Sequence, residues 1–419
     1  MIRPVAARIC YLPTATGRVG AGELMERPLS GIRVIELTPG RATAYATRML
    51  ADLGAQVTAV EPPLGSRLWA RRLDDELDRI TFQSRKQSVA IDLGHPAAPT
   101  VIRRVVAAAD AVLLEADDAT AAELGLDEAS LRAVNEGLVY AVCSSYGPLG
   151  ELHNAPGADI VAQGMSGFMA RTGYPGGAPQ PAGAAIADAA VAMYLCSGIL
   201  AALLQVGRTG RGARVDASRY GALIGAQSWE LNTQAVRGLE TERIGRGHPD
   251  ISGYSVCHVF EAADGWLAIG GMGSPRWEAL CELLGLEGLQ EQFVPYGDSS
   301  KWTVSMDEAL AQIGARFKQR PRAHWVEEFA PRSIQGGPVQ DYAEILGDEQ
   351  ARVNGYITVL AHPVRGELPV VGTPFAIVGA PADQPPLPVE AGADTDRSLE
   401  RVGFDSDAIE ELRATGAIR

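Results

Sequence analysis

A single carboxylate at the start of a long apolar segment is the residue best placed to do chemistry in this sequence. Asp188 directly precedes the run from Ala189 to Val206, in which only three residues are not apolar. A carboxylate at the start of a helix meets backbone N–H donors and the positive end of the helix dipole, which favours its ionised form. An ionised carboxylate can act as a covalent nucleophile. Because Asp is also a preferred N-cap residue, a purely structural role for Asp188 is the competing interpretation.

Other common catalytic signatures do not occur. The sequence has no GxxxxGK[ST], HExxH or GxSxG, and no GxGxxG follows its first predicted strand. Its 5 cysteines lack CxxC spacing and its histidines lack ligand spacing, so we expect no disulfide framework, no metal and no redox cofactor. Scattered cysteines fit a reducing compartment, and we expect a cytoplasmic protein.

The net charge of −14 excludes a large nucleic-acid footprint, since such a footprint needs a concentrated positive surface. An anionic ligand would therefore have to meet local Arg or Lys side chains.

The run from Ala189 to Val206 also has nearly the length of a membrane span. Asp188 at one end and the lack of flanking aromatic anchors favour a buried core helix instead, so we expect no membrane association. Residues 1–24 contain no apolar core of a secretory signal, and Met25 resembles a natural start. We expect residues 1–27 to be a mobile extension.

Apolar strands and helix-forming stretches alternate through the first part of the chain. Predicted strands at 32–37, 57–60, 88–93, 111–115 and 138–143 are separated by predicted helices that include 42–53, 97–109 and 127–134. This alternation predicts an α/β fold with a parallel sheet and helices on both faces. Residues 254–270 change to a hairpin pattern across Ala262–Gly265, which predicts a smaller α+β domain, and residues 405–414 predict a closing helix capped by Asp405 or Ser406.

Several sequence blocks together resemble the class III CoA-transferases, a family that also contains formyl-CoA and carnitine CoA-transferases and α-methylacyl-CoA racemases. They are PLSGIRVIELT, ATRMLADLGAQVTAVEPP, SVAIDL, LRAVNEGLVYAV, GADIVAQGMSG, IADAAVAMYLCSGILAALLQVGRTGRGARVDAS and FDSDAIEELRATGAI. The resemblance covers about residues 28–419. It favours the nucleophile over the cap as the role of Asp188.

The resemblance implies that the Asp of the Ala-Asp block, here Asp188, attacks the thioester of an acyl-CoA donor. A mixed anhydride and then an aspartyl-CoA thioester would carry CoA to a carboxylic acid acceptor. A mobile glycine loop of the family, here Gly245 and Gly247 within 245–249, would cover the Asp; a plain inter-domain turn is the alternative. The residues expected to contact CoA are Arg41, Ala42, Arg67, Arg71, Arg85, Lys86, Glu115 and His248.

The family fold is an interlocked homodimer with linkers threaded through the partner. The resemblance implies a Rossmann-like large domain at 28–220 completed by 370–419, a linker at 221–250, a small domain at 251–345 and a return linker at 346–369.

Two family patterns are altered. The family's Ala-Gly-Pro after the first strand is Ala42-Thr43-Ala44 here, and its Glu-Asn-Phe-x-Pro-Gly, which lines the pantetheine channel, is the stretch 115–120 with two Asp residues. We expect an altered CoA pose, a specialised substrate, or loss of transfer. The racemase branch would need a His and a Glu where this chain has Ala158 and Gly273, so transfer is preferred over racemisation. A non-catalytic CoA-binding protein is the remaining alternative.

Overall fold

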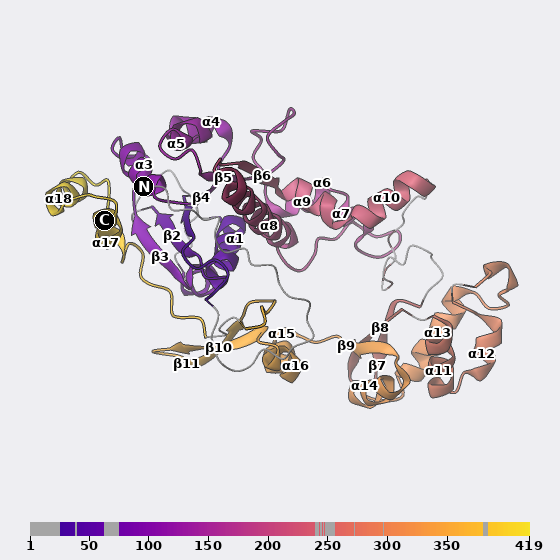
Figure 1. Ribbon diagram of the computed structural model, residues 1–419. Coiled ribbons are helices and arrows are strands. Elements are labelled where there is room, and N and C mark those ends of the chain that lie inside the picture. Colours follow the sequence, from indigo (N-terminus) through magenta and orange to yellow (C-terminus); the bar gives the residue numbers. More distant parts are fainter. Residues whose placement is uncertain are drawn as a thin grey trace. The chain divides into compact units, whose positions relative to one another are not determined.

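The chain divides into two compact units, which are described separately. The computed structural model describes residues 26–37, 40–62, 75–238, 243, 245, 247, 256–271, 273–295, 297–379 and 384–419. The first unit takes in the chain up to Ser166, Gly183–Ala226 and Asp348–Arg419, and the second comprises Gly167–Ala182 and Gln227–Gly347 (Figure 1). The first unit contains Asp188.

A six-stranded sheet forms the centre of the first unit, with the strand order β3-β2-β1-β4-β5-β6. All neighbouring strands pair in parallel. The strands are β1 Arg33–Glu36, β2 Gln56–Glu61, β3 Lys86–Ala90, β4 Ala111–Glu115, β5 Val139–Ser144 and β6 Arg214–Ser218. Their Val, Ile and Leu residues favour extended structure and suit a sheet covered on both faces. The predicted parallel sheet is confirmed.

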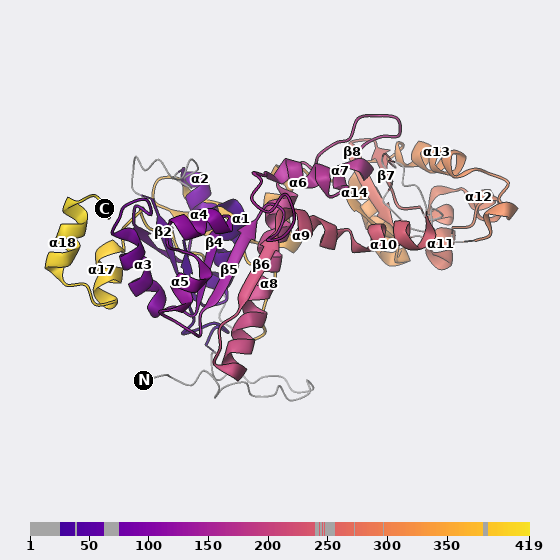
Figure 2. The same ribbon diagram turned by 90° about the horizontal axis from the view of Figure 1, so that it is seen from above.

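Helices cover both faces of this sheet. On one face α1 (Arg41–Asp52) and α8 (Ile186–Thr209) pack against inward residues such as Val34, Leu113 and Val139. On the other face α3 (Ala98–Ala107), α5 (Glu128–Arg132), α17 (Thr395–Arg401) and α18 (Ser406–Ala414) complete a second core (Figure 2). The alternation of side chains along each strand thus divides the apolar residues between two layers.

Helix α8 is long and apolar enough to cross a membrane. In this fold it packs against β5 and β6, and Leu195 and Ile199 are fully buried. A Cβ on Gly198 would come within 2.6 Å of the Val215 side chain, so glycine lets the helix lie close against β6. The face of α8 that lies against the sheet is therefore part of the core, whereas Met193, Tyr194 and Leu204 are about half exposed.

The second unit is built around a three-stranded antiparallel sheet of β7 (His258–Ala262), β8 (Gly265–Gly270) and β9 (Gln335–Pro338). The predicted hairpin across Ala262–Gly265 is present. The stretch 336–338 reads as a loop because of its Gly and Pro, yet it forms the edge strand β9, where Pro is tolerated. Large aromatic side chains, among them Trp277, Phe293 and Phe317, fill the core of this unit.

The C-terminal part of the first unit contains the antiparallel hairpin of β10 (Ile357–His362) and β11 (Gly366–Val371). Helix α18 begins as predicted, because the Asp405 side chain accepts a hydrogen bond from the Ala408 N–H. The remaining helices of the described residues are α2 Glu76–Asp78, the π-helix η2 Arg79–Gln83, α4 Asp118–Glu123, α6 Asp159–Met165, α7 Phe168–Arg171, α9 Arg219–Ala226, α10 Ser228–Arg237, α11 Ser274–Leu284, α12 Glu287–Gln292, the 3-10 turns η3 Ser299–Lys301 and η4 Ala330–Arg332, α13 Met306–Phe317, α14 Arg322–Phe329, α15 Tyr342–Gly347 and α16 Glu349–Val353.

Candidate active site

Asp188 lies in the first turn of α8, two residues after the helix begins at Ile186. Its backbone N–H donates to Asp159 Oδ2 at 2.9 Å, and Asp159 Oδ1 accepts from Gln163 Nε2 at 2.5 Å. Asp159, the first residue of α6, therefore satisfies an N–H at the start of α8, a task that a capping side chain would otherwise perform. The N-cap position itself is Ala185. The interpretation of Asp188 as the N-cap is wrong, and its carboxylate is available for other contacts.

Arg219 holds the Asp188 carboxylate. Its Nε donates to Asp188 Oδ1 and its Nη2 donates to Glu115 Oε1, both at 2.6 Å. The side chains of Arg219, Asp188 and Glu115 are 9%, 14% and 26% exposed, so the cluster is largely withdrawn from water without being sealed. Hydrogen bonds between ionised groups in such surroundings are stronger than those at an open surface.

The parallel sheet explains how these residues meet. Glu115 is the last residue of β4, and Arg219 follows the last residue of β6. The strand between them is β5, whose Cys143 lies opposite both Glu115 and Ala217. The long Arg219 side chain reaches across the carboxyl end of β5 to Glu115, because the carboxyl ends of parallel strands share one edge of the sheet.

The two carboxylates of this cluster favour the protonated form of the Arg219 guanidinium. Burial opposes the charged form of Arg219, but the carboxylates of Glu115 and Asp188 outweigh it and raise the pKa of the guanidinium above its ordinary value. Burial, followed by the charge of Glu115, raises the pKa of the Cys143 thiol. Cys143 is therefore a neutral thiol, which is a poor nucleophile.

The cluster lies at the edge of the sheet where ligands of doubly wound folds bind. The strand order changes direction between β1 and β4, and doubly wound folds generally bind ligands outside the carboxyl ends of two such strands. Glu115 ends β4, while Gly40, the N-cap of α1, follows β1. A Cβ on Gly40 would come within 1.9 Å of Glu115 Oε2. Glycine at this position therefore lets the Glu115 carboxylate lie against the start of α1.

The structure places two more of the predicted CoA-contact residues at this edge. Arg41 is the first residue of α1 and lies 3.8 Å from Asp78 Oδ1, with 41% of its side chain exposed. Ala42 is fully buried beneath it. Arg67, Arg71 and His248 lie outside the described residues.

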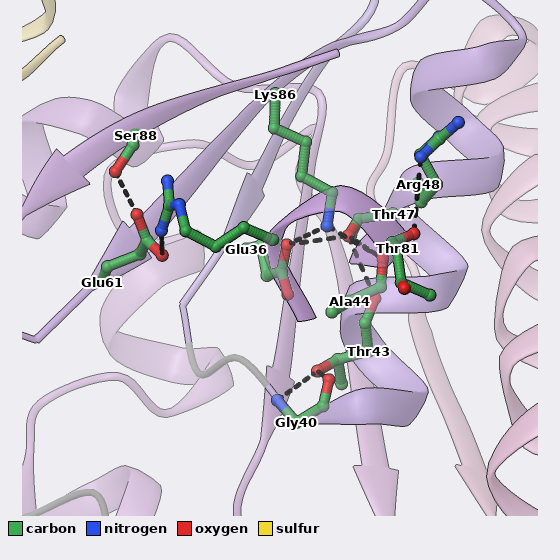
Figure 3. A network of polar contacts seen from close by, with 11 residues as sticks. Glu36, Gly40, Thr43, Ala44, Thr47, Arg48, Glu61, Thr81, Lys86 and Ser88 are labelled. Carbon is green, nitrogen blue, oxygen red and sulfur yellow. Dashed lines mark hydrogen bonds and ion pairs between the residues drawn. The ribbon is translucent and has the colours of Figure 1, made fainter. Parts of the chain in front are cut away.

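The backbone of Lys86 lies at the amino end of β3, and Arg85 directly precedes it. Figure 3 shows the Lys86 ammonium directed at Glu36 and the first part of α1, with hydrogen bonds to Glu36 Oε2 at 2.8 Å and to the Ala44 carbonyl at 2.9 Å. Thr47 Oγ1 donates to the same Glu36 oxygen at 2.8 Å. The Lys86 and Glu36 side chains are 1% and 0% exposed, so this lysine is an internal tie between β1, β3 and α1.

Arg85 and two other arginines line a separate pocket of about 350 Å³ at the far end of α1. Arg85 Nε lies 3.1 Å from Asp52 Oδ1, and Arg48 Nε lies 3.0 Å from the same atom. Asp52 is the last residue of α1, whereas the Glu115 cluster lies against its first turn. The pocket and the Asp188 cluster are therefore distinct places in the fold.

The predicted glycine loop belongs to the second unit. The Gly245 N–H donates to the Gly173 carbonyl at 3.1 Å, and Gly245 has φ 61°, a conformation that glycine favours. Gly247 pairs with His258 in an isolated antiparallel bridge. Both glycines are thus tied to neighbouring backbone within their own unit.

The altered stretch 115–120 runs from the end of β4 into the short helix α4. Asp117 caps α4 by accepting from the Thr120 N–H at 2.7 Å, and Asp118 pairs with Arg214 at 2.9 Å. Both acidic residues that replace the family pattern therefore have structural partners. Among the residues that the structure describes, no group of His, Cys, Asp and Glu is arranged to hold a metal ion.

Sequence reasoning did not single out Arg219 or Asp159 as site residues. A charged residue at the head of the apolar stretch 220–226 was the available signal for Arg219. For Asp159 there was only its place in the Gly-x-Asp block. Neither signal names a partner, because the partners lie on other helices and strands of the fold.

Comparisons with known proteins agree with the resemblance seen in the sequence. Succinate–glutarate CoA-transferase of Agrobacterium fabrum is 32% identical over 371 residues, which cover 84% of this chain and 90% of that protein. Acetyl-CoA:oxalate CoA-transferase of Acetobacter aceti is 28% identical over 324 residues, or 76% of this chain and 82% of that protein. A crystal structure of a CAIB/BAIF family protein from Brucella suis superimposes with a TM-score of 0.77 at 27% identity, covering 90% of this chain and 100% of that one.

The family model described as CoA-transferase family III matches residues 29–395, most of the chain. This match agrees with the blocks from which the resemblance was recognised. The chain belongs to CoA-transferase family III.

Proposed function

We propose that this protein moves CoA from an acyl-CoA thioester to a carboxylic acid, with Asp188 as the covalent nucleophile. The observation that carries the proposal is the state of its carboxylate. Asp159 already serves the helix start, Arg219 holds Asp188 Oδ1, and the side chain remains 14% exposed in a cluster at the ligand-binding edge of the sheet.

The reaction proceeds through four acyl-transfer steps. Asp188 attacks the donor thioester carbonyl, which releases CoA thiolate and leaves a mixed anhydride. The thiolate attacks the aspartyl carbonyl, the donor acid departs with one aspartyl oxygen, and an aspartyl-CoA thioester remains. The acceptor carboxylate then attacks this thioester and forms a second anhydride with release of CoA thiolate. Finally the thiolate attacks the acceptor carbonyl, which restores the Asp188 carboxylate and frees the new acyl-CoA.

The cluster suits this covalent route. The Asp188 carboxylate lies at the positive end of the α8 dipole and accepts a hydrogen bond from the Arg219 guanidinium, so positively charged groups surround the proposed nucleophile. The cluster lies near the strand-order reversal, the part of a doubly wound sheet at which such folds bind extended ligands. CoA carries phosphates, and exposed Arg41 at the same edge is a suitable contact for one of them. Arg67, Arg71, His248 and the glycines Gly245 and Gly247 remain predicted contacts.

The acceptor is proposed to be a short dicarboxylic acid. The name of the Agrobacterium fabrum relative mentions succinate and glutarate, and that of the Acetobacter aceti relative mentions oxalate. The name of a relative from Mus musculus mentions succinyl-CoA and glutarate. We further propose a soluble, cytoplasmic homodimer. Met193, Tyr194 and Leu204 on α8 are about half exposed, and apolar side chains gathered on one helix are typical of a subunit interface.

Racemisation is not favoured by the residues present. It needs a proton donor and a proton acceptor on the two faces of a carbon acid. Ala158 stands before α6 and Gly273 stands before α11, and neither has a side chain that can carry a proton. Deuterium uptake at Cα from heavy water in the absence of an acceptor acid would reveal such an activity.

The test uses Asp188→Asn and a matched variant, Asp110→Asn. Asp110 is a carboxylate of the same sheet, accepts from the Arg33 N–H at 2.8 Å, and lies at the opposite edge, where β4 begins. Succinyl-CoA and glutarate are incubated with each protein and the acyl-CoA products are measured by mass spectrometry. We expect Asp188→Asn to lose transfer and Asp110→Asn to retain it.

Adduct mapping separates a catalytic role from a binding role. Wild type incubated with acyl-CoA and then hydroxylamine should carry a hydroxamate on Asp188, since hydroxylamine attacks acylated carboxylates. A panel of acyl-CoA donors and short dicarboxylic acids extends the assay if succinyl-CoA and glutarate are poor substrates. Full transfer by Asp188→Asn, or an active wild type with an unmodified Asp188, would refute the proposal.

A further inference from the structure

We infer that Arg219 stabilises the negative charge that forms on Asp188 Oδ1 whenever a nucleophile attacks the aspartyl carbonyl. The inference rests on the proposed function and deepens it by assigning a catalytic residue to two of its four steps. It starts from the atom that Arg219 contacts. Within the described part of the chain, the recorded hydrogen bond to the Asp188 carboxylate goes to Oδ1, from Arg219 Nε at 2.6 Å.

The two oxygens of Asp188 then have different fates. When Oδ2 attacks the donor thioester, it becomes the bridging oxygen of the anhydride, and Oδ1 becomes the carbonyl oxygen of the aspartyl group. CoA thiolate adds to that carbonyl carbon, and the electron pair of the C=O bond moves to Oδ1. The electron pair on Oδ1 re-forms the C=O bond when the bond to the bridging oxygen breaks and the donor acid leaves with the negative charge.

The acceptor carboxylate repeats this chemistry on the aspartyl-CoA thioester. Its oxygen bonds to the aspartyl carbon, the charge again forms on Oδ1, and it collapses as CoA thiolate leaves. No proton, electron or further reactant is needed in either step. A donor placed 2.6 Å from Oδ1 in advance lowers both barriers, as donors in an oxyanion hole do.

Glu115 explains how Arg219 keeps this position. Asp188 loses its charge when it is acylated, so the ion pair between Asp188 and Arg219 disappears in both the anhydride and the thioester. Glu115 is not acylated, and its Oε1 still accepts from Arg219 Nη2 at 2.6 Å. The guanidinium has separate N–H donors, so Nη2 can remain on Glu115 while Nε points at Asp188 Oδ1. Glu115 thereby acts as a positioning residue.

The surroundings make this donor effective. Arg219 is 9% exposed, and a charge–charge contact withdrawn from water is screened less than one at an open surface. Its anchor Glu115 packs against Gly40, where a Cβ would come within 1.9 Å of Oε2. Arg219 follows β6 and its anchor Glu115 ends β4, and these two strands flank β5. The guanidinium therefore needs to move little during the reaction.

The inference predicts which step each variant slows. Attack of Asp188 on the donor places the charge on the donor's oxygen, away from Oδ1. Arg219→Gln should therefore slow formation of the aspartyl-CoA thioester about 10² to 10³-fold, the range for loss of one oxyanion donor, and slow the first release of CoA much less. Arg219→Lys retains one charged donor and should lie between wild type and Arg219→Gln.

The experiment measures both steps in one rapid-quench time course. Each enzyme is mixed with succinyl-CoA without acceptor and quenched in acid. Free CoA is measured by chromatography and protein-linked CoA by intact-protein mass spectrometry. We expect wild type to pass quickly to protein-linked CoA, and Arg219→Gln to release free CoA while protein-linked CoA accumulates slowly.

Arg48→Gln is the matched control, because Arg48 forms an ion pair with Asp52 in which both side chains are 8% exposed. It should keep the wild-type ratio of the two rates even if it loses stability. The inference would be overturned if the ratio of the two rates in the Arg219 variants is the same as in wild type, whether or not both steps are slowed. If Arg219→Gln does not fold, the ratio in Arg219→Lys decides the question.

Failure of the inference is distinguishable from failure of the proposed function. If Asp188 is not the nucleophile, wild type itself acquires no CoA on Asp188. If only the inference fails, wild type acquires CoA on Asp188 and the Arg219 variants do so with an unchanged ratio of rates.

Discussion

Replacement of Lys86 by Met tests whether this lysine supports the fold or binds CoA. Its ammonium donates to Glu36 Oε2 at 2.8 Å in a site where the two side chains are 1% and 0% exposed (Figure 3). Burial is the largest cause that lowers the pKa of Lys86, and the charge of Glu36 opposes it. Lys86→Met removes the cation and leaves a buried carboxylate whose remaining donor in this cluster is Thr47.

Removal of one partner of a buried ion pair typically costs about 3 to 5 kcal/mol, because the other charge stays uncompensated. That cost lowers the folding equilibrium constant roughly 10² to 10⁴-fold. The double variant Glu36→Gln with Lys86→Met removes both charges, so we expect it to recover a large part of the lost stability.

Urea unfolding of wild type, single and double variants, followed by circular dichroism, measures these differences. Titration of the same proteins with CoA tests the other role, and we expect affinity within about twofold of wild type where the protein is folded. A loss below about 1 kcal/mol for Lys86→Met, together with CoA binding weakened tenfold or more, would refute the reasoning and restore Lys86 as a CoA contact.

Two further predictions concern the cluster around Asp188. Gly40→Ala places a methyl group where Glu115 Oε2 now lies, so we expect Glu115 to shift and transfer to slow at least tenfold; steady-state kinetics at wild-type-like stability checks this, and unchanged turnover would contradict it. Asp159→Ala removes the acceptor of the Asp188 N–H, so we expect a loss of about 1 kcal/mol and slower formation of the Asp188 adduct, measured by thermal unfolding and mass spectrometry. An Asp159→Ala protein with the stability and adduct rate of wild type would show that this contact is dispensable.

Much of the fold followed from local patterns. The predicted strands of the first unit include apolar runs such as 32–37 and 111–115, and the structure confirms the alternation of strands with helices in a parallel sheet. The start of α18 was predictable because Asp405 caps it through its own neighbouring N–H groups. Patterns of this kind depend on residues close in sequence, so they can be predicted from a single sequence.

Side-chain partners were less predictable. Lys86 was expected at a CoA phosphate, but the structure turns it inward to Glu36, 50 residues earlier in the chain. The stretch 336–338 is rich in Gly and Pro, which are typical of loops, but it pairs with β8 from far along the sequence. In both cases the deciding interaction comes from another strand.

The sequence by itself identified the family and selected Asp188, because an acid before a long apolar helix is a local pattern and the family blocks are contiguous. Only the tertiary structure showed which side chains surround it and how they pair. Arg219 meets Asp188 across 31 residues and Glu115 across 104, and Asp159 meets the start of α8 across 29. The physical reason is the parallel sheet, which gathers the carboxyl ends of strands that are distant in sequence at one edge and thereby determines which charge faces which.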